Sequence, residues 1–576
     1  MTQPGFRQNA DEPIKIKMQN STRVSPEDQD QGGQDLEDQD LVQLSVTALR
    51  RSGQRAVFRC LGRQLSGAEL DRLSDAFARW LLHECHLRPG ERVALQLPNL
   101  LQYPVAALGV LKARGVVVNV NPLYTAPELR LQLCDSDARI LVVFANTAAN
   151  AAQIVAQTPV ECVVVTELGD LLGWPRGPLL NLAARHLRGG IKPYAFARKV
   201  AWREALALGR RHQAQGGELP GPQADDLALL QYTGGTTGVV KAAMLTHRNL
   251  VSNVLQVSEA LGANCPPPGA LIVAPLPLYH VYAFTMNFLM ALHQGHETVL
   301  IPNPRDIDGF VATLKKLPRI DGFAGINTLY KLLCEHPRLH EVDFSALKIA
   351  SSGGMALSRQ VADAWLARTG CRILEGYGLS ECSPVVSCNR YEDYRSGSVG
   401  RPLPRTEVCL KTSSGALAMP GEPGEVCVKG PQVMLGYWRR QEENARVFDA
   451  DGWLHTGDLA VADASGYLRI VDRLKDLIII SGFNVFPNEI EEQACTHPDI
   501  SDACAIAVGD ECAAQIKLFV VSRNARLSAQ DVISHCRQAL AAYKVPRLVE
   551  FRETLPKSNV GKVLRRQLRE PLTEQS

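Results

Sequence analysis

The chain has 576 residues, of which 45% are hydrophobic and 21% charged, so it can hold more than one domain of ordinary globular composition. Its 62 basic and 60 acidic residues leave a net charge of +2, which excludes a general electrostatic affinity for nucleic acid. The 15 scattered cysteines contain no C-x-x-C pair, and the start of the chain shows no apolar signal segment. These features predict a cytoplasmic protein with reduced thiols rather than a disulfide or zinc framework.

Residues 1–41 are polar, and PEDQDQGGQDLEDQD at 26–40 offers almost nothing to bury, which predicts a disordered leader. The folded body is expected to begin near Leu41. Apolar residues then recur at helical spacing over 65–84, and RVALQLPN at 92–99 follows as a strand.

Helices that alternate with apolar strands continue to about residue 395, which indicates α/β architecture with parallel sheets buried on both faces. From about residue 396, short strands separated by glycine turns predict a β-rich subdomain. A compact tail with two strands and a helix capped by Ser528 follows. We place the boundary at 472–476, which gives a large domain over 42–474 and a small α+β domain over 475–576.

The segment LIVAPLPLYHVYAFTMNFLMAL at 271–292 approaches the roughly 20 residues that span a bilayer. Pro275 and Pro277 would break a helix in its first half, and His280 and Asn287 are polar. A buried strand, a turn and a core helix are therefore expected here instead of a membrane span.

A second segment, 174–203, has no acidic residue and mixes basic side chains with aromatic and aliphatic ones. Such a mixture suits the face of an anionic membrane. An equally good interpretation is a solvated surface excursion with snorkelling arginines. The side chains concerned are Trp174, Arg176, Leu179, Leu180, Arg185, Arg188, Lys192, Tyr194, Phe196, Arg198, Lys199, Trp202 and Arg203.

The stretch QYTGGTTGVVKAAMLTH at 231–247 gathers glycines and hydroxyl residues around one lysine. Successive backbone N–H groups of such a loop can converge on phosphate oxygens, while hydroxyls and an ammonium complete the cradle. It is not a Walker A loop, because two valines separate Gly238 from Lys241, and G-G-x-x-G is not a Rossmann fingerprint. Taken alone, this glycine-rich stretch would also be consistent with a tight turn.

Four further stretches accompany this loop, and the five together resemble the acyl-adenylate-forming enzymes, a family of acyl-CoA synthetases, luciferases and nonribosomal-peptide adenylation domains. The five are YTGGTTGVVKAAMLTH (232–247), EGYGLSEC (375–382), GWLHTGDLA (452–460), VDRLKDLIIISGFNVFPNEIE (471–491) and PKSNVGK (556–562). The resemblance runs from about residue 41 to 570 and is greatest to bacterial long-chain-fatty-acid–CoA ligases. It implies two mixed α/β subdomains plus a β-rich one, followed by a small mobile C-terminal domain.

In that family a carboxylate attacks the α-phosphorus of ATP, expels pyrophosphate, and then passes its acyl group to CoA. The resemblance implies that Asp458 accepts the ribose hydroxyls beside Arg473, that Tyr377 faces the adenine, and that Glu381 holds Mg²⁺. The residues implied for ATP and AMP are Tyr232, Thr233, Gly234, Gly235, Thr236, Thr237, Gly238, Lys241, Gly353, Gly354, Glu375, Gly376, Tyr377, Gly378, Ser380, Asp458 and Arg473. The catalytic residues implied are Lys562, Thr236, Lys241 and Glu381.

The resemblance also implies a rotation of the small domain between the two steps. Lys562 would reach the reacting carboxylate and α-phosphate during adenylation, where one ammonium relieves the repulsion of two anions. Lys475 matches the hinge position. After the rotation, Ser481, Gly482 and Phe483 would line the path of the CoA thiol. His280 resembles the gate of the acyl pocket, although a satisfied core histidine is almost as good an interpretation.

Three departures from the family pattern matter. Ala242 replaces a usual glycine, which would introduce strain if that position requires a positive φ. Val240 replaces a frequent proline, which should do no harm. The segment VGDECAAQIKLF at 508–519 is shorter than usual, which weakens the expectation for the CoA step more than for adenylation.

The expected function is ATP- and CoA-dependent activation of long-chain fatty acids, with Mg²⁺, in the cytoplasm and in peripheral contact with the inner membrane face. A medium-chain or aryl acid–CoA ligase is the nearest alternative, because one sequence does not show the shape of the pocket. An amino-acid-adenylating enzyme is disfavoured, since PLPLYHVYAF (275–284) offers no acid for a substrate amine. A catalytically impaired acyl-binding protein is the alternative from another class. Self-association into a homo-oligomer, chain-length preference and the role of the leader stay open.

Overall fold

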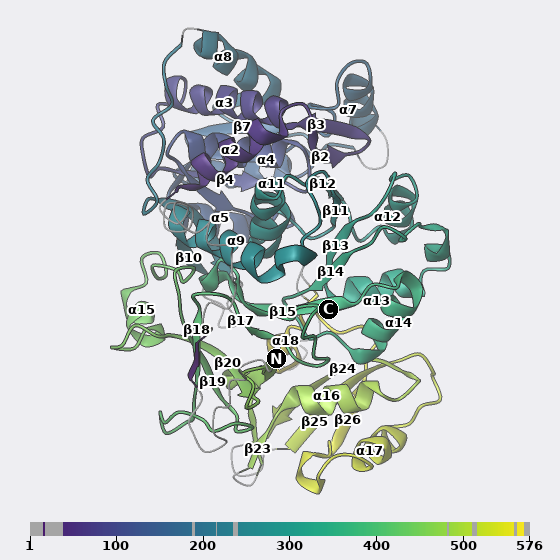
Figure 1. Ribbon diagram of the computed structural model, residues 1–576. Helices are drawn as coiled ribbons and strands as arrows, with labels where there is room; N and C mark the ends of the chain where they lie inside the picture. Colours follow the sequence, from purple (N-terminus) through teal and green to yellow (C-terminus); the bar gives the residue numbers. More distant parts are fainter. Residues whose placement is uncertain are drawn as a thin grey trace, which may run out of the picture.

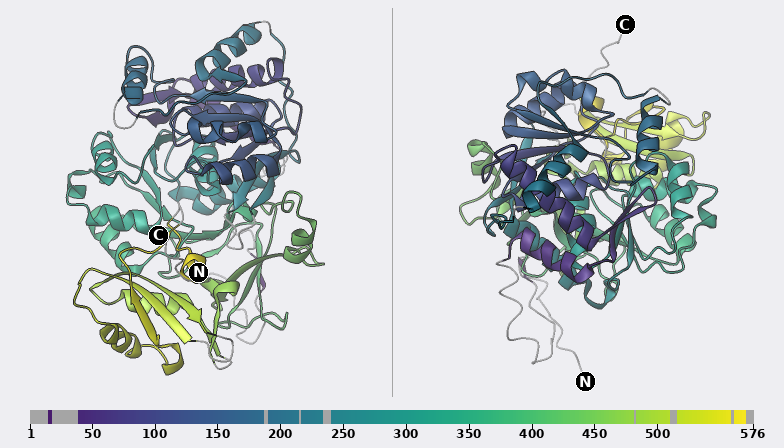
Figure 2. Two further views of the ribbon diagram at one scale, coloured as in Figure 1. Left: turned by 180° about the vertical axis from the view of Figure 1, so that it is seen from behind. Right: turned by 90° about the horizontal axis from the view of Figure 1, so that it is seen from above.

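The computed structural model describes residues 15–17, 39–186, 190–214, 216–233, 240–480, 483–509, 515–557 and 561–569. Three β-sheets with their helices form the large part of the chain, and a small unit lies beneath them in Figure 1. Figure 2 shows the same order from behind, with the helices and strands that follow Leu41 in the upper lobe and the last strands in the lower one. The predicted α/β fold with a separate C-terminal unit is confirmed.

The upper lobe contains a seven-stranded sheet in the order β10-β9-β5-β4-β6-β7-β8, in which only the β10–β9 pair is antiparallel. Its strands are β4 (Arg92–Gln96), β5 (Val116–Asn119), β6 (Ala138–Phe144), β7 (Cys162–Thr166), β8 (Lys199–Ala201), β9 (Leu227–Thr233) and β10 (Lys241–Thr246). Its helices are α3 (Gly67–His83), α4 (Gln102–Lys112), α5 (Ala126–Ser136), α6 (Ala148–Ala152), α7 (Arg176–His186) and α8 (Trp202–Ala214). The predicted first helix and strand correspond to α3, which begins after its N-cap Ser66, and to β4, so both are confirmed.

The middle of the molecule is a nine-stranded sheet in the order β17-β16-β15-β14-β13-β11-β12-β2-β3. The six central strands β15, β14, β13, β11, β12 and β2 run parallel, and the edges are antiparallel. The strands are β2 (Ala56–Cys60), β3 (Arg63–Ser66), β11 (Leu271–Ala274), β12 (Glu297–Leu300), β13 (Gly322–Gly325), β14 (Ile349–Ser352), β15 (Ile373–Gly378), β16 (Val385–Cys388) and β17 (Arg401–Pro402). Its helices include α2 (Leu41–Ser52), α9 (His247–Leu261), α12 (Ile307–Leu314), α13 (Asn327–Glu335) and α14 (Arg359–Thr369).

The β-rich subdomain is a five-stranded antiparallel sheet in the order β1-β18-β19-β20-β21. Its strands are β1 (Lys15–Lys17), β18 (Glu407–Lys411), β19 (Gly424–Lys429), β20 (Leu454–Ala462) and β21 (Leu468–Arg473), with helix α15 (Gln441–Val447) beside it. Strand β1 corrects the prediction of a disordered leader for these three residues. They pair with β18, which lies nearly 400 positions away, and no pattern in the nearby sequence predicts that pairing.

The apolar segment 271–292 forms strand β11 and then a continuous helical stretch made of α10 (Val281–Ala283), the π-helix η3 (Phe284–Met290) and α11 (Ala291–His293). The expected strand, turn and core helix are therefore confirmed. Among the described residues, no helix combines the length and the apolar character needed to cross a membrane.

The small unit contains a three-stranded sheet with helices on it, and a separate two-stranded hairpin precedes it. Its elements are β22 (Ile478–Ile480), β23 (Phe483–Val485), α16 (Pro487–Cys495), β24 (Ile500–Val508), β25 (Gln515–Ser522), α17 (Ala529–Arg537), β26 (Leu548–Phe551) and α18 (Arg565–Arg569). Ser528 caps α17 and accepts a hydrogen bond from the Asp531 N–H, as predicted. Two contacts join this unit to α13: Lys331 Nζ donates to the Ser501 carbonyl at 2.6 Å, and Arg523 lies 2.9 Å from Glu335.

The basic and aromatic segment 174–203 is not a single exposed surface. Trp202 is fully buried, and its ring lies 5.1 Å from that of Phe77 because α8 packs against α3. The prediction that Trp202 belongs to a membrane-facing set is therefore wrong. Trp174, Leu179 and Leu182 are 87%, 62% and 55% exposed, so the outward apolar surface lies on and beside α7.

Candidate active site

A cavity of about 1960 Å³ lies where β13, β14 and β15 end, between the large part of the chain and the small unit. Open α/β sheets bind ligands at the carboxyl ends of their parallel strands. Residues from all five recognised stretches line this one cavity. They include Lys241, Glu381, Asp458, Arg473, Lys475 and Lys562.

Asp458, on β20, stands at the centre of the polar part of this cavity and is 6% exposed. Tyr377 donates its hydroxyl hydrogen to Asp458 Oδ2 at 2.8 Å, and Arg473 Nε lies 3.1 Å from Asp458 Oδ1. Tyr377 and Arg473 come from β15 and β21, so two sheets meet at this carboxylate. The arrangement holds an anionic acceptor in a fixed orientation, as recognition of paired hydroxyl groups requires.

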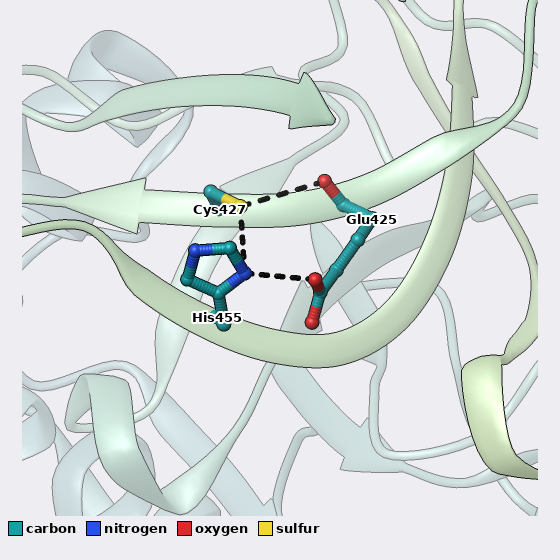
Figure 3. A group of neighbouring side chains, drawn as sticks. All are labelled: Glu425, Cys427 and His455. Carbon is teal, nitrogen blue, oxygen red and sulfur yellow. Dashed lines mark hydrogen bonds and ion pairs between the residues drawn. The ribbon is translucent and has the colours of Figure 1, made fainter. Parts of the chain in front are cut away.

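The turn that presents Asp458 is held by a cluster of Glu425, Cys427 and His455, shown in Figure 3. Glu425 accepts a hydrogen bond from the Gly457 N–H at 2.9 Å, and its other oxygen lies 2.8 Å from His455 Nδ1. Cys427 Sγ lies 3.6 Å from the same nitrogen. Both carboxylate oxygens of Glu425 are thus engaged within the fold, and the cluster supports the Gly457–Asp458 turn.

The glycines of two stretches form the wall beside Tyr377. Gly353 and Gly354 follow β14, and Gly354 has φ +80°. Gly376 lies on β15, and at Gly378 an added Cβ would stand 2.1 Å from the Pro384 carbonyl oxygen, so only glycine fits there. These residues line the cavity, where the resemblance assigns them to the adenine.

Glu375, the first residue of EGYG, lies in the same wall. Burial raises the pKa of its carboxyl to about 7, although the backbone N–H groups of Leu357 and Gly397 counter part of that rise. Its protonation therefore changes close to neutral pH.

The glycine-rich loop joins β9 to β10, and its central residues Gly234, Gly235, Thr236, Thr237 and Gly238 lie outside the described residues. Thr233 lines the cavity at the start of the loop and hydrogen-bonds the Lys241 carbonyl at 3.4 Å.

The loop lysine and the loop tyrosine lie at opposite sides of this segment. Lys241 lines the cavity, and its Nζ lies 2.5 Å from Glu443 Oε2 of α15. Tyr232 contributes to the cavity wall, but its hydroxyl donates to Asp135 at 2.7 Å, so that group anchors the strand.

Ala242 does not introduce the strain considered from the sequence. It is the second residue of β10, pairs with Tyr232 in the ladder and is fully buried. Its φ is not positive, so the backbone here suits any L-residue. The reason is that the strand begins at Lys241, immediately after the loop.

Glu381 and Ser380 lie in a short 3-10 turn after β15, and both line the cavity. Tyr437 donates its hydroxyl hydrogen to Glu381 Oε1 at 2.7 Å, which fixes one oxygen of the carboxylate. Sequence reasoning assigned no role to Tyr437 or to Glu443. Both residues lie outside the five recognised stretches, so those stretches carried no signal for them.

Lys562 reaches the cavity from the small unit and remains solvent-exposed there. Desolvation by the surrounding protein lowers the pKa of its ammonium, Arg473 lowers it further, and the nearby Asp458 and Glu381 raise it. The preceding Gly561 has φ +80°, and a Cβ there would stand 2.8 Å from Thr328 Oγ1 of α13. A glycine therefore lets the Lys562 loop lie directly against the large domain.

His280 faces the same lysine. Burial, and to a smaller extent the charge of Lys562, lower the pKa of its imidazole to about 4. The ring is therefore neutral at pH 7. It caps the helical stretch 281–293, and beyond it the cavity wall turns apolar. That wall includes Val257, Leu261, Met286, Met290 and Ala291. His280 thus lies between the charged part and the apolar part of the cavity, as a gate would.

The residues implied for the hinge and for CoA lie apart from one another. Lys475 lines the cavity, and burial with the nearby Arg473 lowers the pKa of its ammonium to about 8. Phe483 is 58% exposed outside the cavity lining, and its ring lies 5.0 Å from that of Tyr543. Ser481 and Gly482 lie outside the described residues. This arrangement, with Lys562 in the cavity, corresponds to the adenylation pose that the resemblance implies.

Comparison with known proteins agrees with the geometry. A family model described as AMP-binding enzyme matches residues 45–438, and the model of the AMP-binding enzyme C-terminal domain matches 489–562. The chain therefore belongs to the AMP-binding enzyme family.

Within that family the chain is similar to curated long-chain-fatty-acid–CoA ligases. The one from Salmonella typhimurium is 46% identical over 92% of this chain and 94% of the relative, and the one from Bacillus subtilis is 36% identical over 88% and 90%. A feruloyl-CoA synthase from Amycolatopsis is 33% identical over 93% and 99%.

Solved structures share the fold. ATP-bound MatB from Rhodopseudomonas palustris superposes with a TM-score of 0.78 at 28% identity, covering 92% of this chain and 98% of that one. The anthranilate CoA ligase AuaEII with anthranoyl-AMP has a TM-score of 0.81 at 23% identity, covering 92% and 96%, which supports the fold alone.

Proposed function

We propose that the chain is an AMP-forming long-chain-fatty-acid–CoA ligase. One observation carries the proposal: Lys562 of the small unit and Asp458 of the large domain face one cavity, which continues past His280 along an apolar wall. Such a cavity can hold a nucleotide and an alkyl chain end to end, with the reacting atoms between them. The long-chain relatives, at up to 46% identity, support the choice of acid.

The reaction has two steps in which atoms and charges balance. First, a carboxylate oxygen of the fatty acid attacks the α-phosphorus of ATP, and the bond to the β-phosphate oxygen breaks to release pyrophosphate. Next, the thiolate of CoA attacks the acyl carbonyl carbon, and the carbon–oxygen bond to phosphate breaks to release AMP. The thiol proton leaves to solvent, and no cysteine of the chain is needed.

In the first step, Lys562 stands where it can place one positive charge between two anions, the carboxylate and the α-phosphate. We assign to Lys241 a contact with the outer phosphates. It would then exchange its ion pair with Glu443 for contacts to the nucleotide. Thr233 and Thr236 add hydroxyl donors to the same phosphates.

Magnesium fits the carboxylate side of this site. Glu381 lines the cavity with one of its oxygens held by Tyr437, and a hard oxygen ligand is what Mg²⁺ prefers. When bound, the ion neutralises charge on the phosphate oxygens and on the leaving pyrophosphate. Glu381 would therefore hold the ion, and Tyr437 would orient Glu381.

Lys475 is our candidate hinge between the two steps, and Ser481, Gly482 and Phe483 are our candidates for the path of CoA. In the present pose Phe483 lies at the surface, so it must move to meet the thiol. A rotation about one residue at the end of a strand pair can supply that movement. The domains proposed are accordingly 42–474 and 475–576.

We expect the chain to release pyrophosphate with palmitate far more efficiently than with octanoate or benzoate, and to form the thioester only when CoA is present. Each methylene that enters the apolar tunnel contributes about 0.8 kcal/mol, so three additional buried methylenes give roughly 50-fold selectivity. The measurement is kcat/KM from pyrophosphate release for the three acids, with and without CoA. Omission of Mg²⁺ should reduce release to background.

Each alternative predicts a distinct result in that experiment. Preference for benzoate or octanoate would establish the aryl or medium-chain ligase. A burst of pyrophosphate without thioester would show that the second step is damaged, as the short 508–519 segment suggested. If no acid caused pyrophosphate release, the result would favour a catalytically impaired acyl-binding protein, and our proposal would fail.

We also propose that the surface around α7 contacts an anionic membrane, which is where long-chain fatty acids partition. Trp174 and Leu179 point outward with 87% and 62% exposure, and Leu182 lies three residues on from Leu179, so the two leucines share a helix face. Arg176 and Arg185 flank them. Exposed apolar groups next to basic ones are typical of an interfacial helix.

Full-length protein should co-sediment with phosphatidylglycerol-containing vesicles and much less with phosphatidylcholine alone, because the basic groups add electrostatic attraction. Combined Trp174→Ala and Leu179→Ala should lower this partition at least about 10-fold through lost apolar burial. The matched control is Leu131→Ala, which removes a leucine 50% exposed on α5. Equal binding by all three proteins would refute the contact.

A further inference from the structure

The apolar half of the cavity is built from one helical stretch, 281–293, whose sequence is VYAFTMNFLMALH. Met286, Met290 and Ala291 line it from this stretch, and Val257 and Leu261 line it from α9. Farther along, Cys265, Pro266 and His296 contribute to the wall. The His296 ring is already bonded to the Pro266 carbonyl at 2.8 Å. Most of this surface suits methylenes.

Asn287 is the exception. It lines the cavity between the two methionines, it is 2% exposed, and its Oδ1 has no hydrogen-bond partner among the described residues. An unpartnered buried polar atom costs about 1–3 kcal/mol, and native folds contain few of them. Thermodynamic stability alone would therefore favour an apolar residue at this position.

Two other described residues that line the cavity also have a buried polar atom without a hydrogen-bond partner. Neither lies on the acyl side of the cavity. Ser352 ends β14 beside Gly353, at the nucleotide end. Arg565 keeps an ion pair with Glu491 at 2.7 Å through another nitrogen. Asn287 alone among the described residues combines such an atom with a place on the acyl side.

The backbone fixes where the amide of Asn287 lies. The residue sits in the π-helix Phe284–Met290, a wide turn that is rare outside functional sites. Its carbonyl accepts a hydrogen bond from Thr298 Oγ1 of β12 at 2.9 Å. Seven positions along the same helical stretch, about two turns, lead from His280 to Asn287. An acyl chain that enters past His280 would therefore meet Asn287 well beyond its carboxyl group.

We propose that Asn287 forms a polar subsite for a hydroxyl group carried in the middle of a long acyl chain. The inference rests on the proposed function and specifies its substrate class. The unpartnered Oδ1 is an acceptor, and a substrate hydroxyl can donate a hydrogen bond to it. A site built to pair with a substrate oxygen discriminates against the analogue that lacks it, because the protein group is then left unpaired.

The test is a series of monohydroxypalmitates with the hydroxyl moved one carbon at a time, compared with palmitate. In the wild-type protein, kcat/KM should peak at one mid-chain position, roughly 10-fold above neighbouring positions. Asn287→Leu should remove the peak and raise kcat/KM for plain palmitate severalfold, since methylenes then meet an apolar wall. Met290→Leu, an apolar exchange on the same helix, should keep the peak.

Three other outcomes would overturn the inference or its basis. A flat wild-type profile with good palmitate activity removes the subsite but leaves the ligase intact. Equal losses for all acids in Asn287→Leu, with a lower melting temperature, assign the residue to structure alone. No activity of the wild-type protein with palmitate contradicts the proposed function itself.

Discussion

Lys562→Ala is expected to slow acyl-adenylate formation by roughly 10³-fold and to leave thioester formation from supplied acyl-adenylate within about threefold of wild type. The first rate is measured as single-turnover release of pyrophosphate from ATP and palmitate. The second is measured as palmitoyl-CoA produced from synthetic palmitoyl-AMP and CoA. The melting temperature of the variant checks that the fold is intact.

The size of the first effect follows from where the ammonium lies. Lys562 lines the cavity, and the nearby Asp458 and Glu381 raise the pKa of its ammonium against the effects of desolvation and of Arg473. A single preorganised donor at a developing negative charge is worth about 10²–10³ in rate, and here the same group also brings two anions together. In the second step the anhydride already exists, so the repulsion between carboxylate and phosphate no longer has to be overcome.

Lys557→Ala provides the matched control. Lys557 belongs to the same PKSNVGK stretch but pairs with Asp502 within the small unit, so its loss should change both rates less than about threefold. Equal damage to both half-reactions in Lys562→Ala would show that the lysine holds AMP rather than promoting attack.

The five recognised stretches predicted the charged residues at the polar end of the cavity, because each stretch holds its chemically active residues close together in the sequence. The pairing of Tyr377 with Asp458 is an example: the two lie 81 positions apart, and the resemblance assigned both to one nucleoside site. The sequence could not show the direction of each side chain. Tyr232 lies within the loop motif, yet its hydroxyl bonds Asp135, a contact that depends on how β9 packs against α5.

Other features could not be predicted from the sequence, because they depend on contacts between residues far apart along the chain. Strand β1 forms only because Lys15–Lys17 meets the edge of β18. The burial of Trp202 depends on α8 lying over α3, although the basic segment around it looks like a surface. The sequence around Asn287 predicts only a helix. The structure is needed to show that Oδ1 of Asn287 is buried without a hydrogen-bond partner.

Asp458→Asn should raise the KM for ATP by roughly 10- to 150-fold and should slow both half-reactions, unlike the lysine variant. Asp458 binds Arg473 through one oxygen and Tyr377 through the other, so the remaining lone pairs face the cavity as a fixed anion. An asparagine turns one oxygen into a donor, which opposes Arg473 or the ribose hydroxyls. Hydrogen bonds to a charged group contribute about 1.5–3 kcal/mol, which gives the expected range.

Both steps respond because AMP occupies the same ribose site throughout, whereas Lys562 acts only while the anhydride forms. The measurements are KM for ATP in pyrophosphate release and KM for palmitoyl-AMP in thioester formation. Asp451→Asn removes an equal charge from an exposed position in the turn that precedes β20 and should leave both constants unchanged. If Asp458→Asn raised neither KM, the nucleoside would bind elsewhere, and the assignment of this carboxylate, with Tyr377 and Arg473, would have to be abandoned.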